Sequence, residues 1–105
     1  MKTIITASEG NIKAQFDQRF GRAHWFCVFN DENNEITFIP NENIDAQAGA
    51  GSKTAEMVVE MKIDKVISGH FGPKAKDLLE KFDIQMIEMD TNASIEDLIN
   101  KIRIN

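Results

Sequence analysis

The sequence predicts an α/β domain in which helices flank a five-stranded mixed sheet in three layers. Three observations support this fold class: three short β-branched or aromatic segments come first, two further apolar segments follow, and segments of helical period accompany the last two. The predicted order is βββαβαβα, a meander followed by β–α–β crossovers. A chain of 105 residues suffices for one hydrophobic core, so residues 1–105 are expected to form a single domain.

The first half of the chain contains three predicted strands. Thr3–Ala7 is short and mostly β-branched, and His24–Phe29 is apolar and aromatic, as expected for a strand covered on both faces. Residues 9–21 form a polar, glycine-containing loop between them. After a short polar turn, Glu35–Ile39 returns as the third strand, and Pro40 ends it because proline cannot donate to a central ladder.

The second half alternates helices with strands. A first helix is predicted around residues 54–61, a strand at Lys65–Ser68, and a second helix with Pro73 in its first turn, where a missing N–H is tolerated. A last strand at Ile84–Met89 precedes a third helix that Ser94 can cap. Right-handed crossovers would make both of these strands parallel to the first. The residues that recur at helical spacing are Thr54, Met57, Val58 and Met61, then Ala75, Leu78, Leu79 and Phe82, and finally Ile95, Leu98, Ile99 and Ile102.

Composition excludes several classes of protein. A formal charge of −5 argues against nucleic-acid binding, because the phosphates would be repelled. Apolar runs such as Trp25–Phe29 are far too short to span a bilayer, so no membrane partner is expected. Met1-Lys2 leads straight into a strand-like segment without a signal-peptide pattern, and a lone cysteine suits a reducing compartment. A cytoplasmic location is therefore expected.

Three glycine-bearing turns are the candidate functional feature. They are Arg19–Arg22, Gly49–Ser52 and Gly69–Pro73, and the last two run directly into helices. Ligands of open α/β sheets bind outside the carboxyl ends of parallel strands, and all three turns can reach that edge. A helix N-terminus presents free backbone N–H groups that favour anions. The turns therefore predict a pocket for a negatively charged ligand.

Known phosphate motifs do not fit the segment Ala48–Thr54. A P-loop requires Gly-x4-Gly-Lys-Ser/Thr, whereas Ser52 separates Gly51 from Lys53. The Gly-x-Gly-x-x-Gly fingerprint fails because residue 54 is threonine. Two interpretations stay open: the glycines contact a ligand, or they only permit a tight start to the helix.

Conventional metal and catalytic sites find little support. His24-x2-Cys27 has ligand-like spacing, but residues three apart on a strand face opposite sides, so Cys27 is expected to be a buried small hydrophobe. His70, in its glycine turn, is the one candidate metal ligand, although a lone histidine is more often a hydrogen-bonded turn residue. No Ser-His-acid arrangement or Gly-x-Ser-x-Gly elbow is present, and carboxylates are too few at the strand ends for two-metal chemistry. We therefore expect a non-enzymatic protein.

The three turns resemble one family. Arg19-Phe20-Gly21-Arg22-Ala23 before an aromatic strand, Gly49-Ala50-Gly51 before a helix, and Gly69-x-x-Gly72-Pro73-x-Ala75 before Leu78-Leu79 are similar to the dinitrogenase iron–molybdenum cofactor biosynthesis family. The resemblance runs through essentially the whole chain. It implies an RNase H-like fold and a role in carrying or assembling iron–sulfur–molybdenum clusters for nitrogenase, with the cluster as cargo and cluster-assembly proteins as partners.

One residue departs from the family pattern. Nitrogenase-type members commonly have a histidine, a candidate cluster ligand, where this chain has Arg19. Arginine stays protonated and does not ligate metals, but it can hold an anionic cluster by charge-assisted hydrogen bonds. The hypothesis is thus a loosely held anionic cluster, and the alternative is a regulatory module for a phosphate-bearing metabolite or nucleotide. The predicted cofactor-binding residues are Arg19, Phe20, Gly21, Arg22, Gly49, Gly51, Ser52, Gly69, His70 and Gly72.

Overall fold

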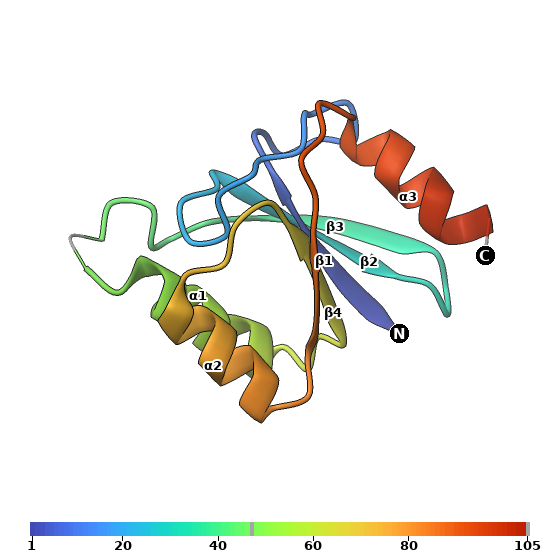
Figure 1. Cartoon of the computed structure of the whole chain (residues 1–105). Coiled ribbons are helices and arrows are strands. Elements are labelled where there is room, and N and C mark those ends of the chain that lie inside the picture. Colours follow the sequence, from blue (N-terminus) through green and yellow to red (C-terminus); the bar gives the residue numbers. More distant parts are fainter. Residues whose placement is uncertain (47, 105) are drawn as a thin grey trace.

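The computed structural model describes residues 1–46 and 48–104. Its eight elements follow in the order of three strands and then alternating helices and strands (Figure 1). Their bounds are β1 Lys2–Ala7, β2 Trp25–Asn30, β3 Glu35–Pro40, α1 Ala50–Glu60, β4 Lys65–Ser68, α2 Pro73–Lys81, β5 Gln85–Glu88 and α3 Ile95–Ile104.

The five strands form one mixed sheet with the spatial order β3-β2-β1-β4-β5. The meander strands are antiparallel, with Ile5 opposite Cys27 and Cys27 opposite Phe38. Strand β4 is parallel to β1, with Ile67 beside Ile5, and β5 is parallel to β4. The prediction of a five-stranded mixed sheet with parallel crossover strands is confirmed.

The helices cover both faces of the sheet. Figure 1 shows α1 and α2 together on one side and α3 on the other. One core cluster joins the sheet to α1 and α2 and includes Phe26, Val58 and Leu79, all fully buried. The second cluster lies under α3 and includes Phe29 and Ile99. Because alternate residues of β2 enter different clusters, this strand is apolar on both faces, as its sequence predicted.

Some predicted boundaries were wrong. Strand β2 begins at Trp25 rather than at the predicted His24, which is exposed and precedes the pairing with β1. Strand β5 does not include Ile84 and Met89, the predicted end residues. The predicted turn Gly49–Ser52 is largely helical, since α1 begins at Ala50 and only Gly49 has a left-handed conformation, with φ 75°. That conformation favours glycine and supports the interpretation of a tight helix start.

The loop between β1 and β2 is tied to the carboxyl edge of the sheet. Phe16 bridges Ala7 at the end of β1, and Arg19 forms a parallel bridge with His70, just beyond β4. The backbone N–H of Phe20 donates to the carbonyl of His70 at 3.3 Å. The first and third glycine turns are therefore neighbours.

No helix within residues 1–46 and 48–104 is long and apolar enough to cross a membrane.

Candidate functional site

A cavity of about 300 Å³ lies at the carboxyl edge of the parallel strands. All three glycine turns contribute to it. The residues that line it are Arg19, Phe20, Gly21, Arg22, Ala50, Gly51, His70 and Gly72. None of these is acidic, although the chain as a whole carries a charge of −5. The cavity thus concentrates positive and neutral groups on an otherwise acidic protein.

Close backbone contact joins the turns to one another. A Cβ atom added at Gly21 would lie 2.8 Å from the backbone nitrogen of Gly51. A Cβ added at Gly69 would lie 2.6 Å from the carbonyl oxygen of Gln18. Both distances are far below ordinary contact, so only glycine lets these segments approach as they do. Gly21 and Gly69 therefore allow the close backbone packing that holds the turns of the site together.

The N-termini of α1 and α2 form the wall opposite Arg19. The N-caps are Gly49 and Gly72, and neither helix has a side-chain cap. The first N–H groups of a helix have no intrahelical acceptor, and the first capping-type bond in α1 is that of Lys53 to the Gly49 carbonyl, at 2.9 Å. Among the residues that the structure describes, no acceptor is bonded to the N–H groups of Ala50, Gly51 and Ser52, so these groups can donate to a ligand. Together with the positive ends of two helix dipoles, they favour an anion.

A second cavity, of about 330 Å³, continues from this wall. It shares Ala50, Gly51 and Gly72 with the first cavity and extends along the two helix starts to Lys74. The starts of the two helices pack against each other here, because a Cβ placed at Gly51 would make an ordinary van der Waals contact with the Ala75 methyl at 3.6 Å. The two cavities therefore form one continuous surface without an acidic lining residue.

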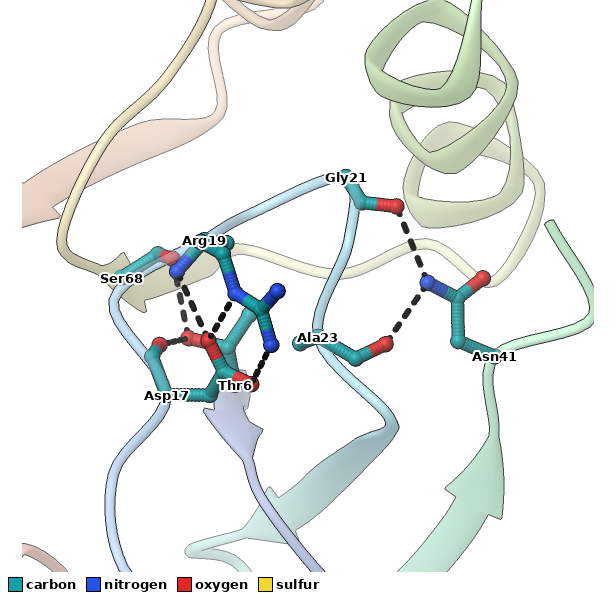
Figure 2. Close-up of polar contacts among 7 residues, drawn as sticks. All are labelled: Thr6, Asp17, Arg19, Gly21, Ala23, Asn41 and Ser68. Carbon is teal, nitrogen blue, oxygen red and sulfur yellow. Dashed lines mark hydrogen bonds and ion pairs between the residues drawn. The ribbon is translucent and has the colours of Figure 1, made fainter. Parts of the chain in front are cut away.

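Asp17 fixes Arg19 in place. Its Oδ1 accepts hydrogen bonds from the backbone N–H and from Nε of Arg19, at 3.0 and 3.1 Å, and its Oδ2 accepts from Nη2 at 3.0 Å (Figure 2). The Asp17 side chain is only 8% exposed, whereas that of Arg19 is 60% exposed. These bonds to the carboxylate raise the pKa of the Arg19 guanidinium. Arg19 is thus held in one position at the rim of the cavity, and the Asp17 carboxylate compensates most of its charge.

Buried hydroxyl groups support Asp17 from below. The Thr6 hydroxyl donates to the Asp17 carbonyl, and the hydroxyls of Thr6 and Ser68 are hydrogen-bonded at 2.9 Å (Figure 2). Thr6 and Ser68 are fully buried near the carboxyl ends of β1 and β4. The sheet itself therefore positions the Asp17–Arg19 pair.

Asn41 holds the other end of the first turn. Its Nδ2 donates to the carbonyls of Gly21 and Ala23, at 3.0 and 2.8 Å, as Figure 2 shows, and its Oδ1 accepts from the Asn43 N–H at 2.9 Å. The residue is 6% exposed. Arg22, between the two carbonyls, donates from Nη1 to the carbonyl of Ile44 at 2.8 Å. The turn is therefore braced on both sides, and Arg22 keeps further N–H donors for a ligand.

The predicted site residues take different places in this geometry. Those at the first cavity are Arg19, Phe20, Gly21, Arg22, Gly51, His70 and Gly72, whereas Gly49 and Ser52 line the adjoining one. Gly69 lines neither and instead packs against Gln18. Phe20 is 1% exposed and packs against Phe71, with ring centroids 5.0 Å apart, so it forms the cavity floor from within the core. The structure thus brings the predicted turns together.

The side chains with metal-ligating atoms are separated. Cys27 is fully buried in the cluster under α3, as predicted, and burial raises the pKa of its thiol to about 12, while His24 is exposed. His70 is exposed at the cavity. Among the described residues, no group of three or more His, Cys, Asp or Glu side chains is arranged to hold a metal ion. The donors at the cavity therefore suit a preformed anion better than a bare metal ion.

Two positioning residues escaped the sequence analysis. Asp17 and Asn41 are not among the residues that line the cavity, but they hold the turn that does. The sequence did carry weak signals: Asp17-x-Arg19 is a short acid–base pair in a polar loop, and Asn41 directly follows the proline that ends β3. The signal at Asn41 does not indicate that its partners lie 18 and 20 residues away in the chain.

Three comparisons place the chain among known proteins. It is 29% identical over 83 residues to an uncharacterised protein of Methanocaldococcus jannaschii. The aligned region covers 76% of this chain and 70% of that protein. Its structure matches the apo form of the orange protein of Desulfovibrio gigas, with a TM-score of 0.88, 22% identity, and coverage of 96% of this chain and 85% of that one. A putative NifB protein from Thermotoga matches with a TM-score of 0.81, 18% identity and the same two coverages, 96% and 85%.

The two structural matches show a shared fold, since their sequence identities are low. The sequence match to a family is more direct. The model of the family described as dinitrogenase iron–molybdenum cofactor aligns with residues 1–104, nearly the whole chain. This chain therefore belongs to the dinitrogenase iron–molybdenum cofactor family.

Proposed function

We propose that this protein is a non-catalytic carrier or assembly protein for an anionic iron–sulfur–molybdenum cluster or a related thiometallate. Membership of the family supports a small cofactor-binding or carrier protein. One observation carries the proposal further: two helix N-termini without side-chain caps and the guanidinium of Arg22 meet at a cavity lined by no acidic residue. A thiometallate is a compact anion, and such a cavity can neutralise it without covalent ligands.

The donor set also suits reversible binding. Backbone N–H groups of α1, the remaining donors of Arg22 and the exposed ring of His70 each contribute a modest interaction. A carrier has to release its cargo, and several weak donors achieve that better than one strong ligand. We propose the cytoplasm as its location, cluster-assembly proteins as its partners, and an RNase H-like classification for its sheet order.

The test is anaerobic titration with tetrathiomolybdate, followed by visible absorbance and gel filtration. We expect near-stoichiometric uptake by the native chain and a reduction of about tenfold in affinity for the double variant Arg22→Ala/His70→Ala, which removes two charge-assisted donors. Lys76→Ala, on the outer surface of α2, is the matched control. Uptake that the double variant leaves unchanged would exclude this cavity as the cargo site.

A second candidate function rests on the adjoining cavity. The starts of α1 and α2 lie side by side there, with Lys74 at the margin, and paired helix N-termini also suit phosphate groups. A regulatory module for a phosphate-bearing metabolite or nucleotide would show no colour after loading. Its melting temperature would rise with phosphate ligands instead, because a ligand that binds the folded state stabilises it.

A further inference from the structure

One buried hydroxyl group on α1 has no hydrogen-bond partner. Thr54 is 0% exposed, and within residues 1–46 and 48–104 its Oγ1 is the one buried side-chain oxygen or nitrogen that lacks a partner. The buried hydroxyls of Thr6 and Ser68, by contrast, bond to each other at 2.9 Å. A buried polar group without a partner destabilises the folded state, so the hydroxyl of Thr54 is not explained by stability.

Thr54 lies one helical turn beyond the part of α1 that lines the cavity at the carboxyl edge of the sheet, the carboxyl-edge cavity. Ala50 and Gly51, which line that cavity, precede Thr54 in the helix by four and three residues. Residues at these spacings share one face of a helix, and helical side chains lean toward the N-terminus. The side chain of Thr54 therefore leans toward the turn that forms the cavity wall.

The same turn contains the usual acceptors for such a hydroxyl. A threonine hydroxyl within a helix commonly donates to the carbonyl four or three residues earlier. For Thr54 these are the carbonyls of Ala50 and Gly51, and neither bond is present. Such a bond bends a helix at a small cost in stability, so it forms only where another interaction compensates for the distortion.

The Ala50 carbonyl and the Gly51 N–H belong to one peptide group. The Gly51 N–H is bonded to no acceptor among the described residues, and Gly51 lines the cavity. Hydrogen bonds at the two ends of one peptide group polarise it and strengthen each other. A donor to the Ala50 carbonyl therefore makes the Gly51 N–H a better donor, and an acceptor at that N–H makes the carbonyl a better acceptor.

We propose that Thr54 is a positioning residue of the carboxyl-edge cavity, and that its hydroxyl donates to the Ala50 carbonyl when an anion accepts from the Gly51 N–H. This inference rests on the proposed anion site and adds to it a residue that does not touch the ligand. Binding of the anion compensates for the bending of the helix, and the hydroxyl gains the partner that it lacks. Thr54 thus lowers the stability of the free protein and raises its affinity for the anion.

Replacement of Thr54 by valine measures both effects, since valine has nearly the same shape without the hydroxyl. We expect Thr54→Val to raise the melting temperature by about 4 °C, because the unpartnered hydroxyl is gone. In anaerobic titration with tetrathiomolybdate, we expect this variant to bind about threefold to tenfold more weakly than the native chain. Thr54→Ser keeps the hydroxyl and should bind tetrathiomolybdate like the native chain.

Two further valine variants are controls for the substitution itself. Thr6→Val removes a hydroxyl that bonds the Asp17 carbonyl and the Ser68 hydroxyl, so it should lower the melting temperature. Thr37→Val, at an exposed position of β3, should leave the affinity for tetrathiomolybdate unchanged. A rise in stability together with a loss of affinity is therefore expected for Thr54→Val alone.

The amide signal of Gly51 in NMR spectra of isotope-labelled protein tests the path through the peptide group. Addition of tetrathiomolybdate should shift this signal in the native chain and in Thr54→Ser. The shift should be smaller in Thr54→Val at saturation, because the carbonyl of that peptide group lacks the second donor. Equal shifts in all three proteins would contradict the proposed path.

Two other outcomes would overturn the inference for Thr54 alone. An unchanged or lower melting temperature of Thr54→Val would show that the hydroxyl is already satisfied, and native affinity of this variant would show that the hydroxyl does not act on the site. In both cases the carboxyl-edge cavity would still be tested by the Arg22→Ala/His70→Ala variant. No uptake of tetrathiomolybdate by the native chain would overturn the proposed function, and the inference for Thr54 with it.

Discussion

The two walls of the carboxyl-edge cavity are held in place in opposite ways. Buried side chains brace the Arg19–Ala23 wall: Asp17 fixes Arg19, and Asn41 bonds the carbonyls of Gly21 and Ala23. The facing wall consists of the N-termini of α1 and α2, which have no side-chain caps. The polar groups of the first wall are hydrogen-bonded to one another and hold its shape. The N–H groups at the helix starts of the second wall have no side-chain acceptor. The braced wall therefore sets the shape of the cavity, and the bare wall of helix N-termini adds binding groups to the remaining donors of Arg22.

The strongest way to break this arrangement is to force the walls apart. Gly21→Val would place a Cβ 2.8 Å from the Gly51 nitrogen, in contact with backbone that cannot rotate away. We expect the free energy of unfolding to fall by about 3 kcal/mol, as for overpacked sites, and tetrathiomolybdate uptake to be lost. Urea denaturation and anaerobic titration measure the two effects. Native-like stability together with native uptake would show that the contact between the walls is dispensable.

The second test removes the brace at Asn41. Asn41→Asp keeps an acceptor for the Asn43 N–H but turns a carboxylate oxygen toward the carbonyls of Gly21 and Ala23. The buried carbonyl of Ala23 and the partly buried carbonyl of Gly21 lose their donor, so we expect a loss of about 2 kcal/mol in the free energy of unfolding. Thermal denaturation measures it, with the exposed Asn100→Asp on α3 as the control. Equal melting temperatures for both variants would contradict a bracing role.

The third test separates shape from charge. Asp17→Asn retains an oxygen for the Arg19 N–H but removes the charge that compensates the guanidinium. We expect a loss of about 1.5 kcal/mol in stability, because charge-assisted bonds weaken, with a gain of about threefold in anion affinity. Denaturation and titration of the same sample measure both. A parallel loss of stability and affinity would mean that the position of Arg19 matters more than its free charge.

The smallest effects should come from the bare wall. Gly49→Ala keeps open space around the new methyl group but forces alanine to a φ of 75°, so we expect a loss of about 1 kcal/mol. Gly72→Ala is the matched control, since its φ is −67° and its surroundings are also open; its stability should change by less than about 0.5 kcal/mol. Thermal melting distinguishes the pair. A larger loss at Gly72 than at Gly49 would contradict this account of the helix starts.

The sequence was sufficient for most of the fold because local patterns dominate it. The β-branched run in β1, the aromatic run in β2 and the apolar stripes of the helices each report their own environment, and most of these residues are buried. The prediction for Phe82 was wrong, because this residue follows the end of α2 and is 51% exposed. The Ser94 cap was also local and is confirmed by the bond from the Asp97 N–H to the Ser94 hydroxyl at 3.1 Å. Boundaries were less predictable, as His24 and Ala50 show, because ladder ends and helix starts depend on neighbouring segments.

The site was predictable only as far as topology determines it. Parallel strands put the Gly69–Gly72 turn at the carboxyl edge, and the convergence of the three turns followed. The sequence signalled the pairing of Arg19 with Asp17 only weakly, because both residues lie in a polar loop whose path depends on its bridges to Ala7 and His70. The bonds of Asn41 to the turn were equally hidden, since they depend on how β3 leaves the sheet.

The close approach of Gly21 to Gly51 has a consequence for the way such a protein changes over time. Because the backbone of Gly21 packs directly against the backbone of Gly51, the outline of the cavity at this contact does not depend on the side chains around its opening. A different side chain can then replace Arg19 at the rim, so that the chemistry of the cavity changes while its dimensions stay the same. Exchange of single rim residues can therefore alter which ligand fits the cavity without a change in the backbone around it.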